Sequence, residues 1–312
     1  MPIFPSDISH LVLAGMKTEF DLAYRRATEE DIMPQIASVI PTTLPTQGYP
    51  WLSATPVTRE FKSERQLKAM KENYQAISDR TWEATIGINR KAFEDDQYGI
   101  INARTNDLGR ELPRHKHQLV VQSYAAGATG TGPDGTTLIS TAHAESGTNQ
   151  SNMGTAALAD TTLKAAMSAM MQYTDDLGVP MGITPDTLVV GPANLFTART
   201  LLQSTINIAT ALGSTSAASV QGNLNALQGM LKLVVSPYLT GTYANYWFVL
   251  DTSRAVRGIL YQYRSDVPDE FAYMRNPETS EDLFMRDLIK AGARGRYNTG
   301  FGLWQTAYGG IV

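Results

Sequence analysis

The sequence predicts an α+β protein made of two closely joined lobes, and three observations support this class. A helical pattern of apolar residues runs from about residue 91 to 124, and short strand-like segments precede and follow it. The 312 residues are enough to bury a sizeable core. At residues 127–135 the chain becomes glycine-rich and then poor in charge, which indicates the boundary between the lobes.

The composition excludes several classes of function. Cysteine is absent, which excludes disulfides, thiolate metal ligands and cysteine nucleophiles. A net charge of −4 argues against a protein that wraps nucleic acid, because such proteins usually need a basic face. Charged residues make up 18% of the chain, against about 25% in a typical soluble domain. We therefore expect part of the surface to be buried against partners.

The sequence contains no signal for export or membrane insertion. Residues 1–5 lack the basic start and apolar run of a signal peptide. No stretch approaches the ~18 consecutive apolar residues that a membrane span needs. We expect a protein that stays in the cytoplasm where it is made and has no membrane partner.

The first 90 residues are predicted to form an arm and a hairpin. Apolar residues recur in a helical stripe over residues 9–26, and prolines at 34, 41, 45 and 50 then favour an extended path. Residues 51–57 and 81–88 have strand-like content, and the second segment alternates strictly between apolar and other residues. The polar stretch between them predicts a long hairpin with a solvated tip.

The longest helix is predicted over residues 91–124. Pro113 should kink it or mark a join between two helices. Glu94, Asp95 and Asp96 fall in its expected first turn, where the helix dipole favours acidic side chains.

Residues 127–265 predict a mixed α/β lobe. Helices are expected over residues 161–176, with Asp160 as the N-cap, and over residues 193–203. Strands are expected at 187–190, 231–235, 246–250 and 258–263. Residues 213–222 predict a surface loop. The last segment, 283–307, mixes apolar and basic residues and predicts a long strand pair that docks on the longest helix.

Two patterns that resemble binding sites are better explained as structure. Glycines at 130, 132 and 135 have the spacing of a dinucleotide-binding motif, but they follow a helix instead of a strand, which favours a turn. His115 and His117 would diverge by about half a turn on a helix. Exposed or interface histidines are therefore favoured over a metal site.

A serine hydrolase built on Ser140 and His143 is the enzyme alternative. Asp134 lies near them in the sequence, but the chain has no Gly-x-Ser-x-Gly nucleophile elbow. We favour a buried hydrogen-bonding role for His143, and we expect no enzyme activity, no cofactor and no metal. A nucleic-acid-binding protein that uses the basic final strands is a third alternative, and the acidic pI argues against it.

Several segments in order carry a resemblance to one family. TWEATIGINR at 81–90 and FEDD at 93–96 resemble the start of the central helix in the Mu-like phage major head subunit family. The segment from FMRD at 284–287 to NTGFGLWQTA at 298–307 is similar to that family's C-terminus. LISTAH at 138–143 and PDTLVVGP at 185–192 are similar to many phage capsid sequences.

The resemblance implies the Hong Kong 97-type capsid fold. Residues 1–50 would form the N-terminal arm, and residues 51–90 the extended loop. Residues 91–126 would form the spine helix of the peripheral domain, residues 127–265 the axial domain, and residues 266–312 the C-terminal strands of the peripheral domain.

The same resemblance implies a shell-forming subunit of a tailed phage. Copies would form the pentamers and hexamers of an icosahedral shell that encloses double-stranded DNA without sequence-specific binding. Separate scaffold, portal and decoration proteins would be partners. Assembly would take place in the host cytoplasm, and the product would be the virion capsid. A cellular shell protein of the encapsulin kind, which shares the fold, is the alternative.

Nine residues are predicted at contacts between subunits. Basic residues of the hairpin would pair with acidic neighbours, tryptophans would anchor packing, and C-terminal arginines would form a salt-bridge network. The nine are Trp51, Arg59, Lys62, Arg65, Lys68, Trp82, Arg286, Arg294 and Arg296. Trp304 is a further candidate anchor between subunits or domains.

Overall fold

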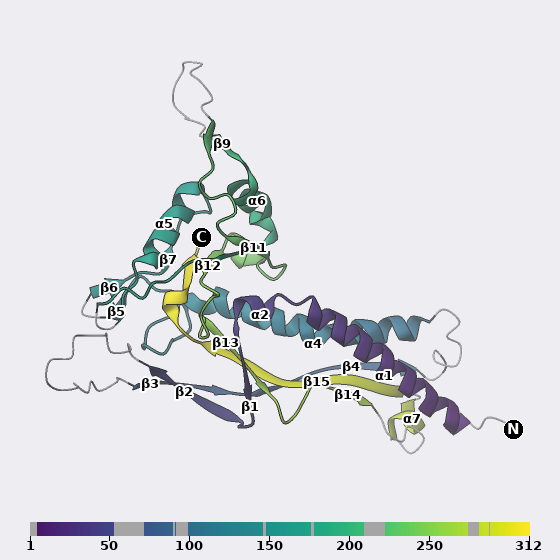
Figure 1. The fold of residues 1–312 in the computed structure, drawn as a ribbon. Helices are drawn as coiled ribbons and strands as arrows, with labels where there is room; N and C mark the ends of the chain where they lie inside the picture. The colour runs from purple at the N-terminus through teal and green to yellow at the C-terminus, as the bar shows by residue number, and fades with distance from the viewer. Residues whose placement is uncertain are drawn as a thin grey trace.

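A computed structural model describes residues 5–52, 72–89, 91, 99–145, 148–175, 178–208, 222–273, 281–286 and 288–312. The molecule has an elongated lower part, built from a sheet and two long helices, and an upper lobe that rises above one half of it (Figure 1). Among the helices in these ranges, none is both long enough and apolar enough to cross a membrane.

The lower part is organised around β15 (Leu288–Phe301), a strand of 14 residues. One edge of β15 pairs antiparallel with β4 (Arg80–Asn89). The other edge pairs first with β14 (Glu270–Tyr273) and then with β13 (Ile259–Arg264). A parallel pairing between β13 and β1 (Ser38–Thr42) completes this sheet, which we call the lower sheet.

Two long helices, α1 (Pro5–Glu29) and α4 (Ile100–Ala125), pack against each other beside the lower sheet (Figure 1). The helices lie close together at Gly109, where a Cβ atom would lie 2.7 Å from the carbonyl oxygen of Phe20. Glycine inside a helix is unfavourable relative to alanine. The close contact between helices explains why this position lacks a side chain.

The upper lobe contains a second sheet, in the order β11 (Lys232–Val235), β8 (Thr187–Val190), β12 (Trp247–Leu250), β16 (Ala307–Gly310) and β7 (Met153–Gly154). Strands β8 and β12 are buried along their whole length, as their continuous apolar runs require. The helices α5 (Asp160–Met171) and α6 (Leu195–Gln203) bury their apolar faces in the same core.

Short elements complete the described chain. Three antiparallel hairpins join β2 (Thr46–Leu52) to β3 (Glu72–Ser78), β5 (His143–Glu145) to β6 (Thr148–Gln150), and β9 (Ile206–Ile208) to β10 (Gly222–Leu224). The helix α2 (Met33–Ile36) follows α1, and α7 (Glu281–Arg286) precedes β15.

The second strand predicted for the hairpin, at residues 81–88, is wrong. Strand β2 pairs with β3, at residues 72–78, whereas residues 80–89 pair with β15. The alternation at residues 81–88 is genuine, because Trp82, Ala84, Ile86 and Ile88 point to one side and pack on the core. Alternation specifies which face of a strand is buried, but it does not specify the strand's partner.

Helix starts also differ from the predictions. Helix α4 begins at Ile100, after Gly99 with its positive φ of 68°, and it continues through Pro113 as one helix. Glu94, Asp95 and Asp96 therefore precede it, and they lie outside the described residues. Helix α5 begins at Asp160 with Ala159 as its N-cap, so Asp160 is not the cap. Most of the loop predicted at 213–222 also lies outside the described residues.

The two sheets do not follow the domain boundary predicted at residue 265. Strand β13, at residues 259–264, belongs to the lower sheet, and β16, at residues 307–310, belongs to the upper one. The final basic segment forms one long strand instead of a strand pair, and it contacts α4. These differences arise because strand partners lie far apart in the sequence.

Candidate functional site

The residues of the hydrolase alternative form a buried hydrogen-bonded cluster. His143 is fully buried, with its Nδ1 atom 2.6 Å from Asp134 Oδ2 and its Nε2 atom 3.1 Å from Asn152 Oδ1. Its ring stacks on Trp304, with 4.0 Å between the ring centroids. Both ring nitrogens are thus occupied, which leaves His143 no nitrogen to act as a base on Ser140. The buried hydrogen-bonding role predicted for His143 matches this geometry.

Asn152 makes this cluster a junction between distant segments. Its side-chain NH₂ donates to the carbonyl oxygens of Leu138, Ala307 and Trp304 at 2.8, 3.0 and 3.3 Å. Its side-chain oxygen accepts from the backbone N–H of Ser140 at 2.7 Å. The turn that follows α4 is thereby fastened to the segment that connects the lower sheet to the upper one.

Asp134→Asn is expected to lower the free energy of unfolding by about 1–3 kcal/mol at neutral pH, because His143 loses a charged acceptor. Burial by itself raises the pKa of the Asp134 carboxyl, but hydrogen bonds from His143 and Thr136 outweigh burial and hold the pKa below its usual value. The contribution of the carboxylate is therefore complete above its unfolded-state pKa of 3.8 and is lost as the pH falls through the lower folded-state pKa.

Urea denaturation of the wild type and the variant, from about pH 7 to about pH 2, measures this effect. The difference between the two proteins should shrink at the acidic end. A difference that stays constant over the whole range would contradict the charged pairing of Asp134 with His143.

The two histidines of α4 are partly buried inside the chain, whereas the sequence predicts exposed or interface positions. His115 packs against Trp82, with 4.3 Å between the ring centroids, and its Nδ1 atom lies 2.9 Å from the hydroxyl of Tyr297. His117 forms a hydrogen bond with the hydroxyl of Ser236 at 3.1 Å, and burial lowers its pKa to about 4. Within the described residues, no cluster of three or more potential ligands could hold a metal ion.

The nine predicted contact residues fall into three groups. The hairpin residues Arg59, Lys62, Arg65 and Lys68 lie outside the described residues, and so does the side chain of Trp51. Trp82 packs within the chain, and its Nε1–H donates to the carbonyl oxygen of Tyr297 at 2.9 Å. The remaining three are the arginines Arg286, Arg294 and Arg296.

These arginines differ in exposure. Arg286 is exposed on α7. The side chain of Arg294 is 48% exposed and lies 3.6 Å from Glu270. Arg296 is less exposed and lies 2.6 Å from Asp79. Arg286 and Arg294 are therefore placed where a neighbouring molecule can reach them, and Arg296 is engaged inside the chain.

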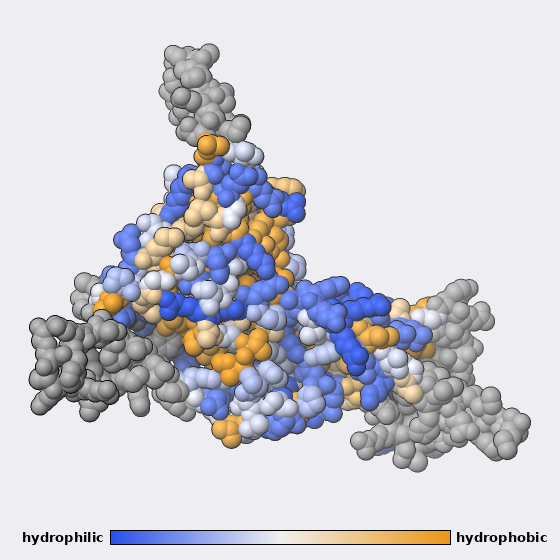
Figure 2. Space-filling model, in the orientation of Figure 1, coloured by the Kyte–Doolittle hydropathy of each residue, from blue (hydrophilic) through white to orange (hydrophobic). Residues whose placement is uncertain are grey.

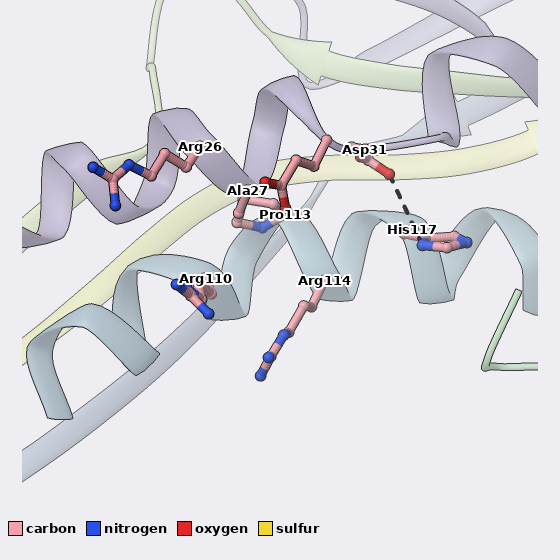
Figure 3. A pocket seen from close by; sticks show the side chains of 8 residues that line it. Arg26, Ala27, Asp31, Arg110, Pro113, Arg114 and His117 are labelled. Atoms are coloured by element: carbon pink, nitrogen blue, oxygen red, sulfur yellow. Dashed lines mark ion pairs between the residues drawn. The ribbon is translucent and has the colours of Figure 1, made fainter. Parts of the chain in front are cut away.

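A basic cleft that the sequence does not reveal lies between the end of α1 and the middle of α4 (Figure 3). Its volume is about 330 Å³, and Arg26, Arg110 and Arg114 are among its lining residues. In the described part of the chain, none of these three guanidinium groups forms an ion pair. Among the described residues, three arginines and two acidic residues, Glu30 and Asp31, line the cleft, so it has surplus positive charge and suits an acidic partner.

Exposed apolar side chains gather on the upper lobe. Phe196 is 75% exposed and Leu224 is 84% exposed. Figure 2 shows apolar surface on the side of this lobe that carries α6 and β11. Large exposed apolar side chains that are grouped on a surface indicate contact with another molecule. Neither surface was predicted, because each is assembled from segments that are far apart in the sequence.

Comparisons with known proteins give consistent matches. The model of the family described as "Mu-like prophage major head subunit gpT" matches residues 10–157, 151–239 and 240–310. The chain is 23% identical over 275 residues to the "Mu-like prophage FluMu major head subunit" of Haemophilus influenzae (strain ATCC 51907 / DSM 11121 / KW20 / Rd). That alignment covers 88% of this chain and 64% of the relative, so the chain spans less than two thirds of the relative's length.

Solved structures share the fold. The procapsid of bacteriophage JBD30 matches with a TM-score of 0.54 and 24% identity, over 98% of this chain and 75% of that one. A virus-like particle from Pyrococcus furiosus matches with a TM-score of 0.56 and 8% identity, over 95% of this chain and 98% of that one. At such low identities the likeness concerns the fold, which is the α+β Hong Kong 97-type capsid fold that the resemblance implied.

Proposed function

Since the chain belongs to the Mu-like prophage major head subunit family, we propose that it is the major capsid protein of a tailed double-stranded DNA phage. The match of the family model to three segments between residues 10 and 310 is the observation that carries this proposal. Copies of the chain assemble into pentamers and hexamers, and these close into an icosahedral shell around the genome. The net charge of −4 fits loose contact with DNA that does not depend on its sequence.

Each part of the molecule has a place in this proposal. Helix α4 and the lower sheet form the peripheral domain, with α4 as the spine helix. The upper lobe is the axial domain, the β2–β3 hairpin is the extended loop, and α1 belongs to the N-terminal arm. Scaffold, portal and decoration proteins are separate chains, and assembly takes place in the host cytoplasm.

The protein acts through its shape and contacts, and it needs no catalyst or cofactor for this role. The occupied ring nitrogens of His143 argue against the hydrolase alternative. The encapsulin alternative has the same Hong Kong 97-type fold, so the structural matches do not separate it from a phage subunit. The family model, and not the fold, favours the phage subunit.

Two surfaces of the described chain are proposed contacts between subunits. The basic cleft between α1 and α4 suits carboxylates of a neighbouring copy, because arginine pairs well with planar oxyanions. The apolar side of the upper lobe around α6 suits a second upper lobe. Arg286 on α7 and Arg294 in the middle of β15 supply further charged contacts.

Analytical ultracentrifugation of the purified chain with negative-stain microscopy tests this function. Closed shells, or rings of five and six copies, are expected at moderate salt. Arg110→Glu combined with Arg114→Glu should reduce these products, whereas Arg104→Glu, an exposed position of α4 outside the cleft, should not. A chain that remains a monomer or dimer with scaffold candidates present would refute the proposal.

A further inference from the structure

The root of the β2–β3 hairpin consists of residues 46–49 and 75–79. We infer that the chain itself fixes the angle of this hairpin through contacts at the hairpin root, before any neighbouring subunit touches it. The inference rests on the proposed function only for the consequence that the angle has in a shell. The contacts that support a fixed hairpin angle all lie within one chain.

The first anchor is a side chain that fits over a glycine. Ile77 of β3 is only 3% exposed and lies on Gly300 of β15. A Cβ atom at position 300 would lie 2.3 Å from Ile77 Cδ1 and 2.5 Å from Ile77 Cγ1, closer than real side chains approach. Gly300 does not have a positive φ, so its backbone conformation does not require glycine. The need for space beneath Ile77 is what excludes a side chain there.

The second anchor is a buried amide that ties both hairpin strands to the lower sheet. Gln262 of β13 is fully buried. Its Oε1 atom accepts a hydrogen bond from the hydroxyl of Tyr49 on β2 at 2.8 Å. Its Nε2 atom donates to the carbonyl oxygen of Ile77 on β3 at 3.4 Å. One side chain therefore holds the two strands at a fixed distance from β13.

The third anchor is a carboxylate placed between two arginines. Asp79 follows β3 directly, and its side chain is 8% exposed. Its Oδ2 atom lies 2.6 Å from Arg296 Nη2 on β15 and 3.5 Å from Arg264 Nη1 on β13. Its backbone N–H donates to the carbonyl oxygen of Pro45, just before β2, at 2.8 Å. Ion pairs this poorly solvated are much less screened than surface pairs.

Together the three anchors involve both hairpin strands and two strands of the lower sheet. A rigid body held at several separate points cannot rotate without breaking some of these contacts. The hairpin root is therefore preorganised, which lowers the ordering cost when a neighbouring copy binds the hairpin. In a shell, a preset angle would limit the curvature that the subunits can adopt.

Distance measurements on the unassembled chain test the inference directly. The chain has no cysteine, so Ala76→Cys on β3 and Asp107→Cys on α4, both exposed positions, give a uniquely placed pair of nitroxide labels. Pulsed electron paramagnetic resonance on the monomer fraction should give one narrow distance distribution. A broad distribution would show that the neighbour sets the angle, and it would overturn the inference.

Two variants and a matched control separate positioning from general stability. Gly300→Val should shift the distance distribution, because it displaces Ile77, and Asp79→Ala should broaden it. The control is Glu270→Gln on β14, which removes the carboxylate beside Arg294 of β15. This pair lies outside the hairpin root, so the distance distribution should stay unchanged. Thermal unfolding of each variant is recorded alongside. Lower melting temperatures with an unchanged distribution in both root variants would overturn the inference, whether or not the chain assembles.

Discussion

Replacing Lys116 by methionine is expected to lower the free energy of unfolding by about 3–5 kcal/mol, because the Asp269 carboxylate is left without its cation. The Lys116 ammonium contacts Asp269 Oδ2, and the two side chains are 13% and 12% exposed. The hydroxyl of Tyr24 on α1 donates to the same carboxylate at 2.6 Å. Burial by itself lowers the pKa of Lys116, but Asp269 and Tyr24 outweigh burial and raise it, so the ammonium stays charged.

Equilibrium denaturation of a double-mutant cycle measures this effect. Lys116→Met with Asp269→Leu should recover most of the loss, because no unpaired charge then remains in the buried site. Lys164→Met is the control, since its pair with Asp160 is exposed and should be worth less than about 1 kcal/mol. Equal losses at positions 116 and 164 would contradict this description of the Lys116 pair.

Trp304→Ala is expected to lower the free energy of unfolding by about 3–5 kcal/mol, as truncation of a large buried aromatic side chain usually does. Trp304 is 1% exposed and lies between β15 and β16, where the chain passes from the lower sheet to the upper one. It stacks on His143, and its centroid lies 5.1 Å from that of Tyr173. The cavity would thus open at the junction of the two lobes.

Guanidinium denaturation of Trp304→Ala and Trp304→Phe checks this prediction. Phenylalanine keeps one ring against His143, so Trp304→Phe should lower the free energy of unfolding clearly less than Trp304→Ala does. Losses below about 1 kcal/mol for both variants would show that the junction does not depend on this side chain.

Local sequence patterns predict many of the helices and strands of the fold. The continuous apolar runs of β8 and β12 predict buried strands close to where the structure has them. The helical stripe at residues 9–26 lies within α1, and the apolar pattern of the longest helix continues to Ala125. These features depend on neighbours in the chain, which sequence periodicity reports.

Strand partners and sites could not be obtained in the same way. The return strand of the hairpin was misassigned because residues 72–78 have weaker alternation than residues 81–88, which pair with β15. The buried role of His143 was predicted, but Asn152 and Trp304 join it only through the fold. Beneath the hairpin root, the signal in the sequence is Gly300, one of the three glycines of β15. Glycine within a strand often marks a close approach of another segment.

Cryo-electron microscopy of the particles formed by the purified chain tests the central claim most directly. We predict a closed shell of five- and six-membered rings, in which the upper lobes meet at the ring centres and each β2–β3 hairpin lies on a neighbouring copy. A chain that forms neither closed particles nor rings of five and six copies when scaffold candidates are present would contradict the proposal that it is a capsid subunit. A particle in which the hairpins contact no neighbour would contradict it as well.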